Sequence, residues 1–482
     1  MTYRLWRNGV LPLLLLVWIT ALPGHVLAAA GDLDTSFGTN GIVNTDFYSR
    51  KDIGYSVAVQ SDGKIVLAGK ANTESSSDNF ALVRYTSDGT LDSSFGVGGK
   101  QTLDFNNGLD VGSAVTILSD GKILLAGKAT PSSAQEFAVA RFTSSGMVDT
   151  SFGTNGKATT SMGTLTDEVN AVGIQSDGSI VIVGAASNGS NRDFALARFT
   201  STGALDTTFN STGKVLTNFF NQDDYGKGMA IQSDDKIVVA GYTNTGTDRD
   251  FALARYTSSG AQDTTFGTNG LVHTDIGSAN DYGYAMALQS DGKIVVAGRV
   301  EGGSNVNVGV TRYTSSGVLD TSFGTAGKVN MNITSDDDMV QTVAIQSDGK
   351  ILVGGYYRKT SSVYDIFLAR FTSDGTLDTT FGTNGKVTTA NDSRSIQSNT
   401  MAIQSDGNIL VGGYIADSSY DFALARYLGT STGSSTNPST NTSTAKPVPS
   451  ASLPWLAVMA LALAYAGMFV LRRRKRFPGG RS

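Results

Sequence analysis

One pattern dominates the chain: nearly the same block of residues is written seven times. The phenylalanine of an SFG-like motif, the arginine of an ALARY-like segment and the aspartate of a QSDGK-like turn each recur seven times, 56 to 58 residues apart. Self-similarity at a fixed period is the signature of a repeat architecture. We therefore expect one repetitive body rather than several unrelated domains.

Each repeat carries four short strand signals, which residues 284–330 illustrate. YAMALQ, KIVVAG, NVGVTRY and the SFGTAGKVN region are the strands, and SDGK joins the first two as a tight hairpin turn. Runs such as KIVVAG are apolar on both faces, which is typical of a sheet packed between two others. The sequence predicts an all-β, seven-bladed β-propeller of four-stranded antiparallel blades. A one-dimensional β-solenoid is the alternative.

The order of strand signals at the two ends predicts how the ring closes. The body begins with a fourth-strand signal, LDTSFGTNGIV, and ends with a third-strand signal, DFALARY. Six third-strand arginines are followed eight residues later by an aspartate, as in Arg84 and Asp92, a spacing that places the two opposite each other across a reversal. Arg426 lacks such a follower and Asp34 lacks such a predecessor. We expect these two to pair, with the N-terminal strand completing the last blade.

The repeat also resembles a known family. LDTTFGTNGKV, QSDGKIVVAG and DFALARYTSSG resemble the bacterial delta-60 repeat family, and the resemblance covers about residues 31–429. It implies an NHL-like β-propeller and attaches no general activity to it. The C-terminal order of VPSASLPW, an apolar helix and an arginine cluster is similar to the sorting tails of Gram-negative surface proteins, without a PEP, IPTL or LPxTG signature.

The two ends of the chain predict export and anchoring. Residues 1–30 combine Arg4 and Arg7, the apolar run LPLLLLVWITAL and small residues at the exit, which is the pattern of a signal peptide. Residues 31–429 form the propeller, and the Ser/Thr/Pro-rich residues 430–452 form a stalk. Residues 453–471 are apolar enough for a transmembrane helix, and the basic residues 472–482 after it should stay in the cytoplasm. The propeller is thus expected outside the cytoplasm, in a bacterial cell envelope or at its surface.

Composition excludes several kinds of chemistry. The chain has no cysteine, and His273 is the one histidine after the leader, so thiolate metal sites and histidine-based triads are excluded. The formal net charge of −5 includes +2 from residues 1–30 and +7 from residues 430–482, so residues 31–429 carry −14. Such a body should repel nucleic acid and favour cations or basic partners. No motif requires an organic cofactor.

One set of acidic residues suggests a cation site. An aspartate stands ten residues before the turn aspartate in six repeats, and Ile396 takes its place in the seventh. At the start of the innermost strands these carboxylates would ring one mouth of the channel and could hold Ca²⁺ or a cationic group. The alternative is that each one caps its local turn. The six residues are Asp52, Asp110, Asp167, Asp224, Asp281 and Asp338.

Function is expected where the repeats differ. The loops between second and third strands differ in every copy, whereas the SDGK and TSDGTL reversals barely change, so one face gathers the variation. This favours a non-catalytic binding, adhesion or scaffold module whose ligand is an extracellular protein or glycan. The alternatives are a propeller-type hydrolase or lyase, or a purely structural envelope component. Aromatic residues able to stack on sugars occur in the variable connections, at Phe47, Tyr48, Phe219, Phe220, Tyr225, Tyr282, Tyr356, Tyr357 and Tyr420.

Overall fold

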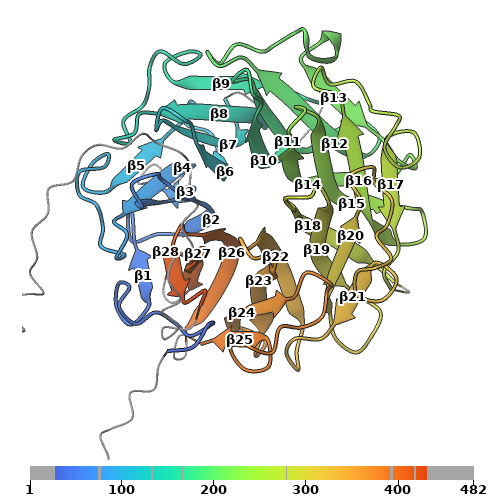
Figure 1. Ribbon diagram of the computed structural model, residues 1–482. Helices are drawn as coiled ribbons and strands as arrows, with labels where there is room; N and C mark the ends of the chain where they lie inside the picture. The colour runs from blue at the N-terminus through green and yellow to red at the C-terminus, as the bar shows by residue number, and fades with distance from the viewer. Residues whose placement is uncertain are drawn as a thin grey trace, which may run out of the picture. The chain divides into compact units, whose positions relative to one another are not determined.

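The computed structural model confirms the seven-bladed β-propeller. It describes residues 28–430 except 74–76, 132–133, 164–166, 278, 391–393 and 417–418. Seven four-stranded antiparallel sheets are arranged radially about one axis, with the first strand of each repeat nearest the centre (Figure 1). The expected leader (residues 1–27 of it), stalk, membrane helix and basic tail lie outside the described residues. Among the described ones, no helix combines the length and the apolar character needed to cross a bilayer.

The strands follow the repeat strictly. The innermost strands are β2 (Asp52–Val59), β6 (Val111–Ile117), β10 (Glu168–Ile174), β14 (Asp224–Ile231), β18 (Asp281–Leu288), β22 (Asp338–Ile345) and β26 (Ser395–Ile403). The second strands are β3 (Ile65–Asn72), β7 (Ile123–Ala129), β11 (Ile180–Ser187), β15 (Ile237–Asn244), β19 (Ile294–Val300), β23 (Ile351–Arg358) and β27 (Ile409–Ala416). The third strands are β4 (Asp78–Tyr85), β8 (Glu136–Phe142), β12 (Arg192–Phe199), β16 (Arg249–Tyr256), β20 (Asn307–Tyr313), β24 (Tyr364–Phe371) and β28 (Tyr420–Tyr427). The outer strands are β5 (Lys100–Leu103), β9 (Lys157–Thr160), β13 (Lys214–Thr217), β17 (Leu271–Thr274), β21 (Lys328–Met331), β25 (Lys386–Thr389) and β1 (Ile42–Thr45). A short 3₁₀ turn, η1 (Phe209–Ser211), precedes β13.

The two ends of the propeller meet in one blade. β1 pairs antiparallel with β28, with Ile42 opposite Ala425 and Thr45 opposite Phe422. Figure 1 shows the blue β1 beside the red β28, so the sheet order is β1-β28-β27-β26. The closure predicted from the order of strand signals is confirmed. It leaves no blade with fewer strands than the others, and hence no unpaired third strand at the seam.

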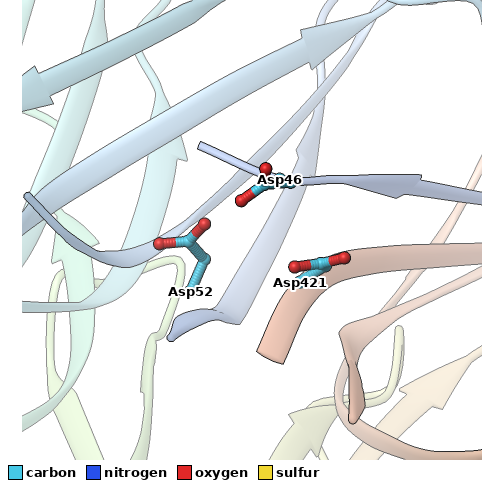
Figure 2. Close-up of side chains that lie close together, drawn as sticks. All are labelled: Asp46, Asp52 and Asp421. Atoms are coloured by element: carbon cyan, nitrogen blue, oxygen red, sulfur yellow. The ribbon is translucent and has the colours of Figure 1, made fainter. Parts of the chain in front are cut away.

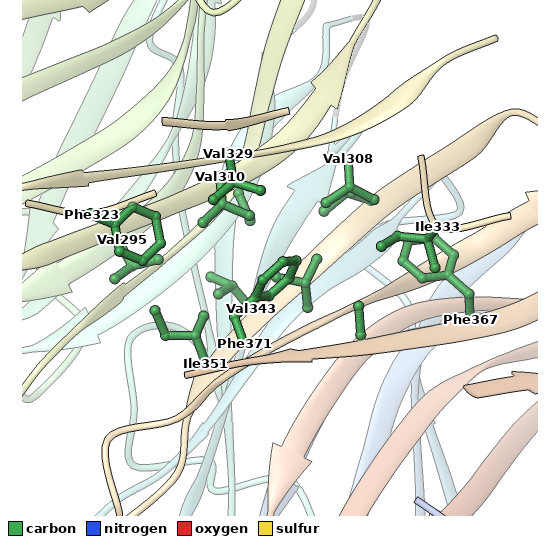
Figure 3. Packing of buried hydrophobic residues seen from close by; sticks show 14 residues of the cluster. Val295, Val308, Val310, Phe323, Val329, Ile333, Val343, Ile351, Phe367 and Phe371 are labelled. Carbon is green, nitrogen blue, oxygen red and sulfur yellow. The ribbon is translucent and has the colours of Figure 1, made fainter. Parts of the chain in front are cut away.

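The core lies between the blades. Second and third strands are buried on both faces because each sheet packs against the sheets before and after it, as in β16, where seven of eight residues are buried. Figure 3 shows one such layer, in which Val295 and Val310 of one blade pack on Val343 and Phe367 of the next. Apolar runs of the KIVVAG type therefore have the composition that this double burial requires.

An arginine on each third strand connects its blade to the next one. In Arg84, Nε donates to Asp92 at 2.9 Å and Nη1 donates to the backbone carbonyl of Ser144 in the following blade. The guanidinium also lies over the Phe95 ring, 4.6 Å from its centroid. All seven repeats contain this arrangement, and Arg426 makes it across the seam with Asp34, where Nε donates to Oδ2 at 2.8 Å. We call these seven residues the blade arginines: Arg84, Arg141, Arg198, Arg255, Arg312, Arg370 and Arg426.

Candidate ligand-binding site in the central channel

The innermost strand of every blade contains a β-bulge that aims one extra side chain at the axis. In β14, for example, Gly226 lies opposite Gly241 and Gly228 opposite Ala240, so Lys227 has no partner in the ladder. A bulge of this kind re-aims a side chain and is over-represented near functional sites. The seven bulge residues line one cavity of about 450 Å³, which lies on the axis because all seven blades contribute to it. They are Tyr55, Ser113, Asn170, Lys227, Tyr284, Gln341 and Asn399.

A glycine on the second strand makes each bulge fit. Gly241 pairs with the residue before the bulge, and a Cβ at this position would overlap the carbonyl oxygen of Tyr225. The same overlap would occur at the corresponding glycine of each other repeat. The final glycine of the KIVVAG motif is therefore required by the bulge opposite to it.

The residue after this glycine forms a second variable ring. Its side chain lies nearer the loops between second and third strands than the bulge residue does, and its identity also differs between repeats. The seven residues are Lys70, Lys128, Ala185, Tyr242, Arg299, Tyr356 and Tyr414. Lys70 and Lys128 line the central cavity together with the bulge residues. Two rings of variable side chains thus stand on a scaffold whose turns, glycines and blade arginines recur in every repeat.

Positive charge exceeds negative charge on one side of the cavity. Glu168 accepts a hydrogen bond from Arg192 at 2.8 Å, and Lys227 Nζ lies 3.6 Å from its other carboxylate oxygen. Burial opposes ionisation of Glu168, but Lys227, Arg192 and Lys128 outweigh it, so the pKa of this carboxyl is lowered. Burial lowers the pKa of Lys128 and of Lys227. Three cations therefore surround one carboxylate, within a body whose net charge is −14.

A cluster of tyrosines and arginines adjoins the cavity through Tyr284, which lines it and lies 6.2 Å from Tyr242 and from Tyr282, centroid to centroid. Tyr225 and Tyr242 stack with ring centroids 4.9 Å apart, and Tyr282 meets Tyr242 edge-on at 5.0 Å. The guanidinium of Arg299 lies over the Tyr282 ring at 4.1 Å from its centroid, and Arg249 lies over it at 5.5 Å. Flat apolar faces beside fixed cations suit a ligand that has both rings and negative charge.

The aromatic residues singled out in the sequence divide into two groups. Phe47 packs on Phe422 and Phe219 on Phe194, with ring centroids 5.1 Å apart in both pairs, so these side chains support their own loops. Tyr225, Tyr282, Tyr356 and Tyr420 belong to clusters of aromatic rings. Tyr48 and Phe220 are exposed, and Tyr357 donates a hydrogen bond to Asp365 at 3.2 Å.

The six aspartates expected to ring the channel mouth are placed elsewhere. Each is fully buried at, or directly before, the first residue of an innermost strand, and one carboxylate oxygen accepts the backbone N–H five residues earlier. In Asp52 the other oxygen accepts the N–H of Asn72, which ends the second strand. The structure thus corrects the expected position: these carboxylates cap the connection between blades, and the cavity is lined by the bulge residues instead.

Two groups of three carboxylates occur between blades among the described residues. Asp46, Asp52 and Asp421 lie together at the seam (Figure 2), and Asp250, Asp275 and Asp281 lie together between the blades of β14–β17 and β18–β21. Within each group, one oxygen per residue lies within 4.8 Å of the others. The two groups occupy equivalent positions of the repeat: second residue of a third strand, first residue after an outer strand, and first residue of the next innermost strand.

The buried aspartates predict an unusual dependence of stability on pH. Burial raises the pKa of Asp167 and Asp338 to about 6 and that of Asp224 to about 7. Their contribution to stability is therefore complete below the free-aspartate pKa of 3.8 and is lost as pH rises through about 6 to 7. Burial also raises the pKa of Asp263, but hydrogen bonds from Thr265 and the charge of Arg255 outweigh it and lower that pKa to about 2. The ionised Asp263 therefore stabilises the folded protein above pH 3.8, and this stabilisation is lost as pH falls toward 2.

We expect the free energy of unfolding to be highest near pH 4 and to fall between about pH 4 and pH 7, because the folded protein holds protons there that the unfolded chain has lost. Urea unfolding monitored by circular dichroism across this range would measure it. Asp224→Asn should flatten the decline between about pH 4 and pH 7, whereas Asp234→Asn, at an exposed turn on the opposite face, should leave the profile unchanged. A stability that rises steadily from pH 4 to pH 8 would contradict the expectation.

The fold and the channel together define a class: a seven-bladed propeller with a polar, ligand-sized cavity on its axis. The chain belongs to the family described as domain of unknown function (DUF5122) beta-propeller, whose model matches residues 60–95, 118–152, 175–209, 232–266, 289–323, 346–381 and 404–432. No curated protein matches the chain.

Solved structures with a similar fold include several lyases. Virginiamycin B lyase from Staphylococcus aureus shares 14% identity with a TM-score of 0.47, covering 80% of this chain and 98% of that one. A streptogramin B lyase shares 12% identity with a TM-score of 0.45, covering 80% and 97%. A polysaccharide lyase of family PL25, an ulvan lyase, shares 12% identity with a TM-score of 0.41, covering 83% and 96%. At these identities the similarity concerns the propeller fold alone.

These structures correct one expectation from the sequence. The scarcity of histidine and cysteine led to the expectation that the protein is not an enzyme. Solved structures with this fold include lyases, so the scarcity of histidine and cysteine does not exclude an enzyme, and the expectation is wrong.

Proposed function

We propose that the protein binds an acidic carbohydrate in its central channel. The observation that supports this most strongly is the pair of variable rings, which puts different side chains at the same two positions of a uniform repeat. A scaffold that only had to close would need no such diversity at the axis, since the positions that hold the blades together, such as the blade arginines, are the same in every repeat. The cavity volume of about 450 Å³ falls within the range of small-molecule sites.

The chemistry of the wall favours a ring-bearing anion. Lys128, Lys227 and Arg192 face a single carboxylate, so an incoming carboxylate or sulfate would meet a net positive field. Tyr55 and Tyr284, which line the cavity, offer flat faces of the kind that stack on sugar rings. Neutral polar residues such as Gln341 can hydrogen-bond to hydroxyl groups.

The proposed setting is the outer side of a bacterial membrane. Residues 1–30 would direct export, and residues 453–471 would anchor the propeller by a stalk formed from residues 430–452. In this position the propeller would present its channel to extracellular or envelope glycans. Protease treatment of intact cells, followed by detection of residues 31–429, tests this placement.

The test of binding uses Lys128→Met in the full-length protein. Among the described residues, the side chain of Lys128 forms no ion pair or hydrogen bond, so its loss removes a charge from the cavity without breaking the fold. Calorimetric titration with uronate-containing or sulfated oligosaccharides should show binding by the wild type that falls about tenfold or more in the variant, since a charged hydrogen bond contributes about 1.5–3 kcal/mol. Neutral oligosaccharides of the same length should bind weakly to both proteins.

Lys236→Met is the matched control, because it removes the same charge from a turn on the opposite face. It should bind like the wild type. Equal affinities for charged and neutral oligosaccharides, or equal binding by Lys128→Met and the wild type, would contradict the proposal.

A second candidate is catalysis on the same ligand, by hydrolysis or elimination. The lowered pKa of Lys128 and Lys227 favours it, because a buried lysine that loses its proton more readily is a usable general base. Incubation of the bound oligosaccharides, with chromatography to detect shortened or unsaturated products, separates catalysis from binding. Products formed by the wild type and lost in Lys128→Met would support it.

A further inference from the structure

The carboxylates of Asp250, Asp275 and Asp281 lie together at one junction between blades. Asp250 is the second residue of β16, Asp275 directly follows β17, and Asp281 begins β18 of the next blade. One oxygen from each lies within 4.8 Å of the other two. Asp275 is exposed, whereas Asp250 is 5% exposed and Asp281 is fully buried, so the group is open to solvent on one side only.

Two of these buried carboxylates have oxygens without a partner. Oδ1 of Asp250 and Oδ1 of Asp281 are buried and accept no hydrogen bond. The other oxygen of Asp281 accepts the N–H groups of Ile276 at 2.6 Å and Gly277 at 3.0 Å. A buried carboxylate without a donor is costly unless a cation or a proton neutralises it.

The other third-strand aspartates show how this position is normally satisfied. Asp193 accepts hydrogen bonds from the side-chain amides of Asn188 and Asn218, both at 2.9 Å. Oδ2 of Asp365 pairs with Lys359 at 2.9 Å, so the charge of this carboxylate is neutralised although its Oδ1 has no hydrogen-bond partner. At Asp250 the residue corresponding to Asn218 is Asp275, so a donor is replaced by a third carboxylate.

The seam group shares the three-carboxylate composition but differs in its partners. Both oxygens of Asp52 accept backbone N–H groups, from Phe47 and Asn72, and Asp421 accepts a hydrogen bond from Ser419. The seam group therefore lacks the unpartnered buried oxygens that Asp250 and Asp281 have, and the inference concerns the second group alone.

The nearest basic side chains do not complete the Asp250 site. Lys328 Nζ donates to the backbone carbonyl of Asp275 rather than to a carboxylate. His273 stacks edge-on against Phe220, with ring centroids 5.2 Å apart. Within the part of the chain that the structure describes, no ion pair includes any of the three aspartates.

We propose that Asp250, Asp275 and Asp281 bind a hard divalent cation, with Ca²⁺ as the best match to an all-oxygen site on exposed connections. Carboxylate oxygens are the ligands that Ca²⁺ prefers, and its coordination number is variable enough to combine three carboxylates with water from the open side. Bound here, the ion would join β16 and the end of β17 to β18, so it would connect two blades near their variable loops. The site is separate from the channel and does not rest on the carbohydrate proposal.

The test is calorimetric titration of EDTA-treated full-length protein with CaCl₂, together with thermal unfolding with and without Ca²⁺. The wild type should bind Ca²⁺ and unfold at a higher temperature when it is present. Asp250→Asn should weaken binding by a factor of about ten or more, because the charge of the ligand set governs affinity. Asparagine stands at this position in two other repeats, as Asn79 and Asn307, so the variant is compatible with the fold.

Two further variants make the result decisive. Asp275→Asn changes an exposed residue and should weaken Ca²⁺ binding without altering the melting temperature in EDTA. Asp193→Asn, at the same strand position of the preceding blade, should bind Ca²⁺ like the wild type. Absence of both heat and a thermal shift in the wild type, or unchanged binding in Asp250→Asn and Asp275→Asn, would overturn the proposal.

Discussion

Deletion of residues 31–46 should remove most of the stability of the propeller and make it aggregate. These residues supply β1, which covers the backbone edge of β28, and Phe37, which is fully buried in the first inter-blade layer. They also supply Asp34, the partner of Arg426. Loss of a buried phenylalanine costs about 3–5 kcal/mol and removal of one partner of a buried ion pair costs about 3–5 kcal/mol. Together these approach the whole stability of a typical folded protein, about 5–15 kcal/mol.

The measurements are the melting temperature and the state of association. The deletion variant should unfold at a much lower temperature than the full chain and should elute as large aggregates, because an uncovered β28 is free to pair with another molecule. A synthetic peptide of residues 31–46 added in trans should restore the monomer by adding the missing strand. A scrambled peptide of the same composition should not. A monomer with an unchanged melting temperature would show that the seam does not hold the ring closed.

The success of the fold prediction has a physical basis in the register of the repeat. Seven copies of one strand pattern leave few ways to bury a sheet that is apolar on both faces, and a closed ring is one that leaves no exposed end. In six repeats an arginine pairs with the aspartate eight residues later, but Arg426 and Asp34 each lack such a partner. Because these two residues are left over, they pair with each other, and this identified the N-terminal strand as the one that closes the ring.

The site could not be predicted in the same way because a single bulge changes which face a side chain occupies. If side chains alternated strictly along β14, Lys227 would pair with a residue of β15 like its neighbours. The bulge between Gly226 and Gly228 removes it from this pairing and aims its side chain at the axis. The sequence held one signal: the third residue after each of the six repeated aspartates differs between repeats, as Lys227 does after Asp224. The other signal was the glycine that the second strand of each repeat places opposite the bulge.

The prediction for the six repeated aspartates was wrong for a different reason. Their regular spacing correctly placed them at the start of the innermost strands, but a position along a strand does not determine whether a carboxylate points to the axis or back to its own loop. Backbone N–H groups in the preceding connection, such as that of Phe219 at 2.9 Å from Asp224, decide the matter. Those donors depend on loop conformation, which a repeat pattern does not specify.

Arg255→Met is expected to destabilise the propeller by about 3–5 kcal/mol, the cost of leaving a buried charge without its partner. Arg255 Nε donates to Asp263 at 2.8 Å, and both side chains are less than 9% exposed. Nη1 donates to the carbonyl of Ser315 in the next blade at 2.6 Å, and the guanidinium lies 4.7 Å from the centroid of the Phe266 ring. Methionine keeps the apolar contact but leaves the Asp263 carboxylate and the Ser315 carbonyl without this donor.

Lys236→Met is the matched control, since Lys236 also contacts Asp263, at 3.4 Å, but is 32% exposed. A solvent-exposed pair of this kind contributes about 0–1 kcal/mol. Chemical unfolding of both variants at one pH and salt concentration would compare them. The double variant Arg255→Met and Asp263→Asn should recover part of the loss, because it removes the unpaired charge. If the two single variants lost equal stability, the arginine would act as an ordinary surface cation, and its contact with the neighbouring blade would contribute nothing to holding the ring together.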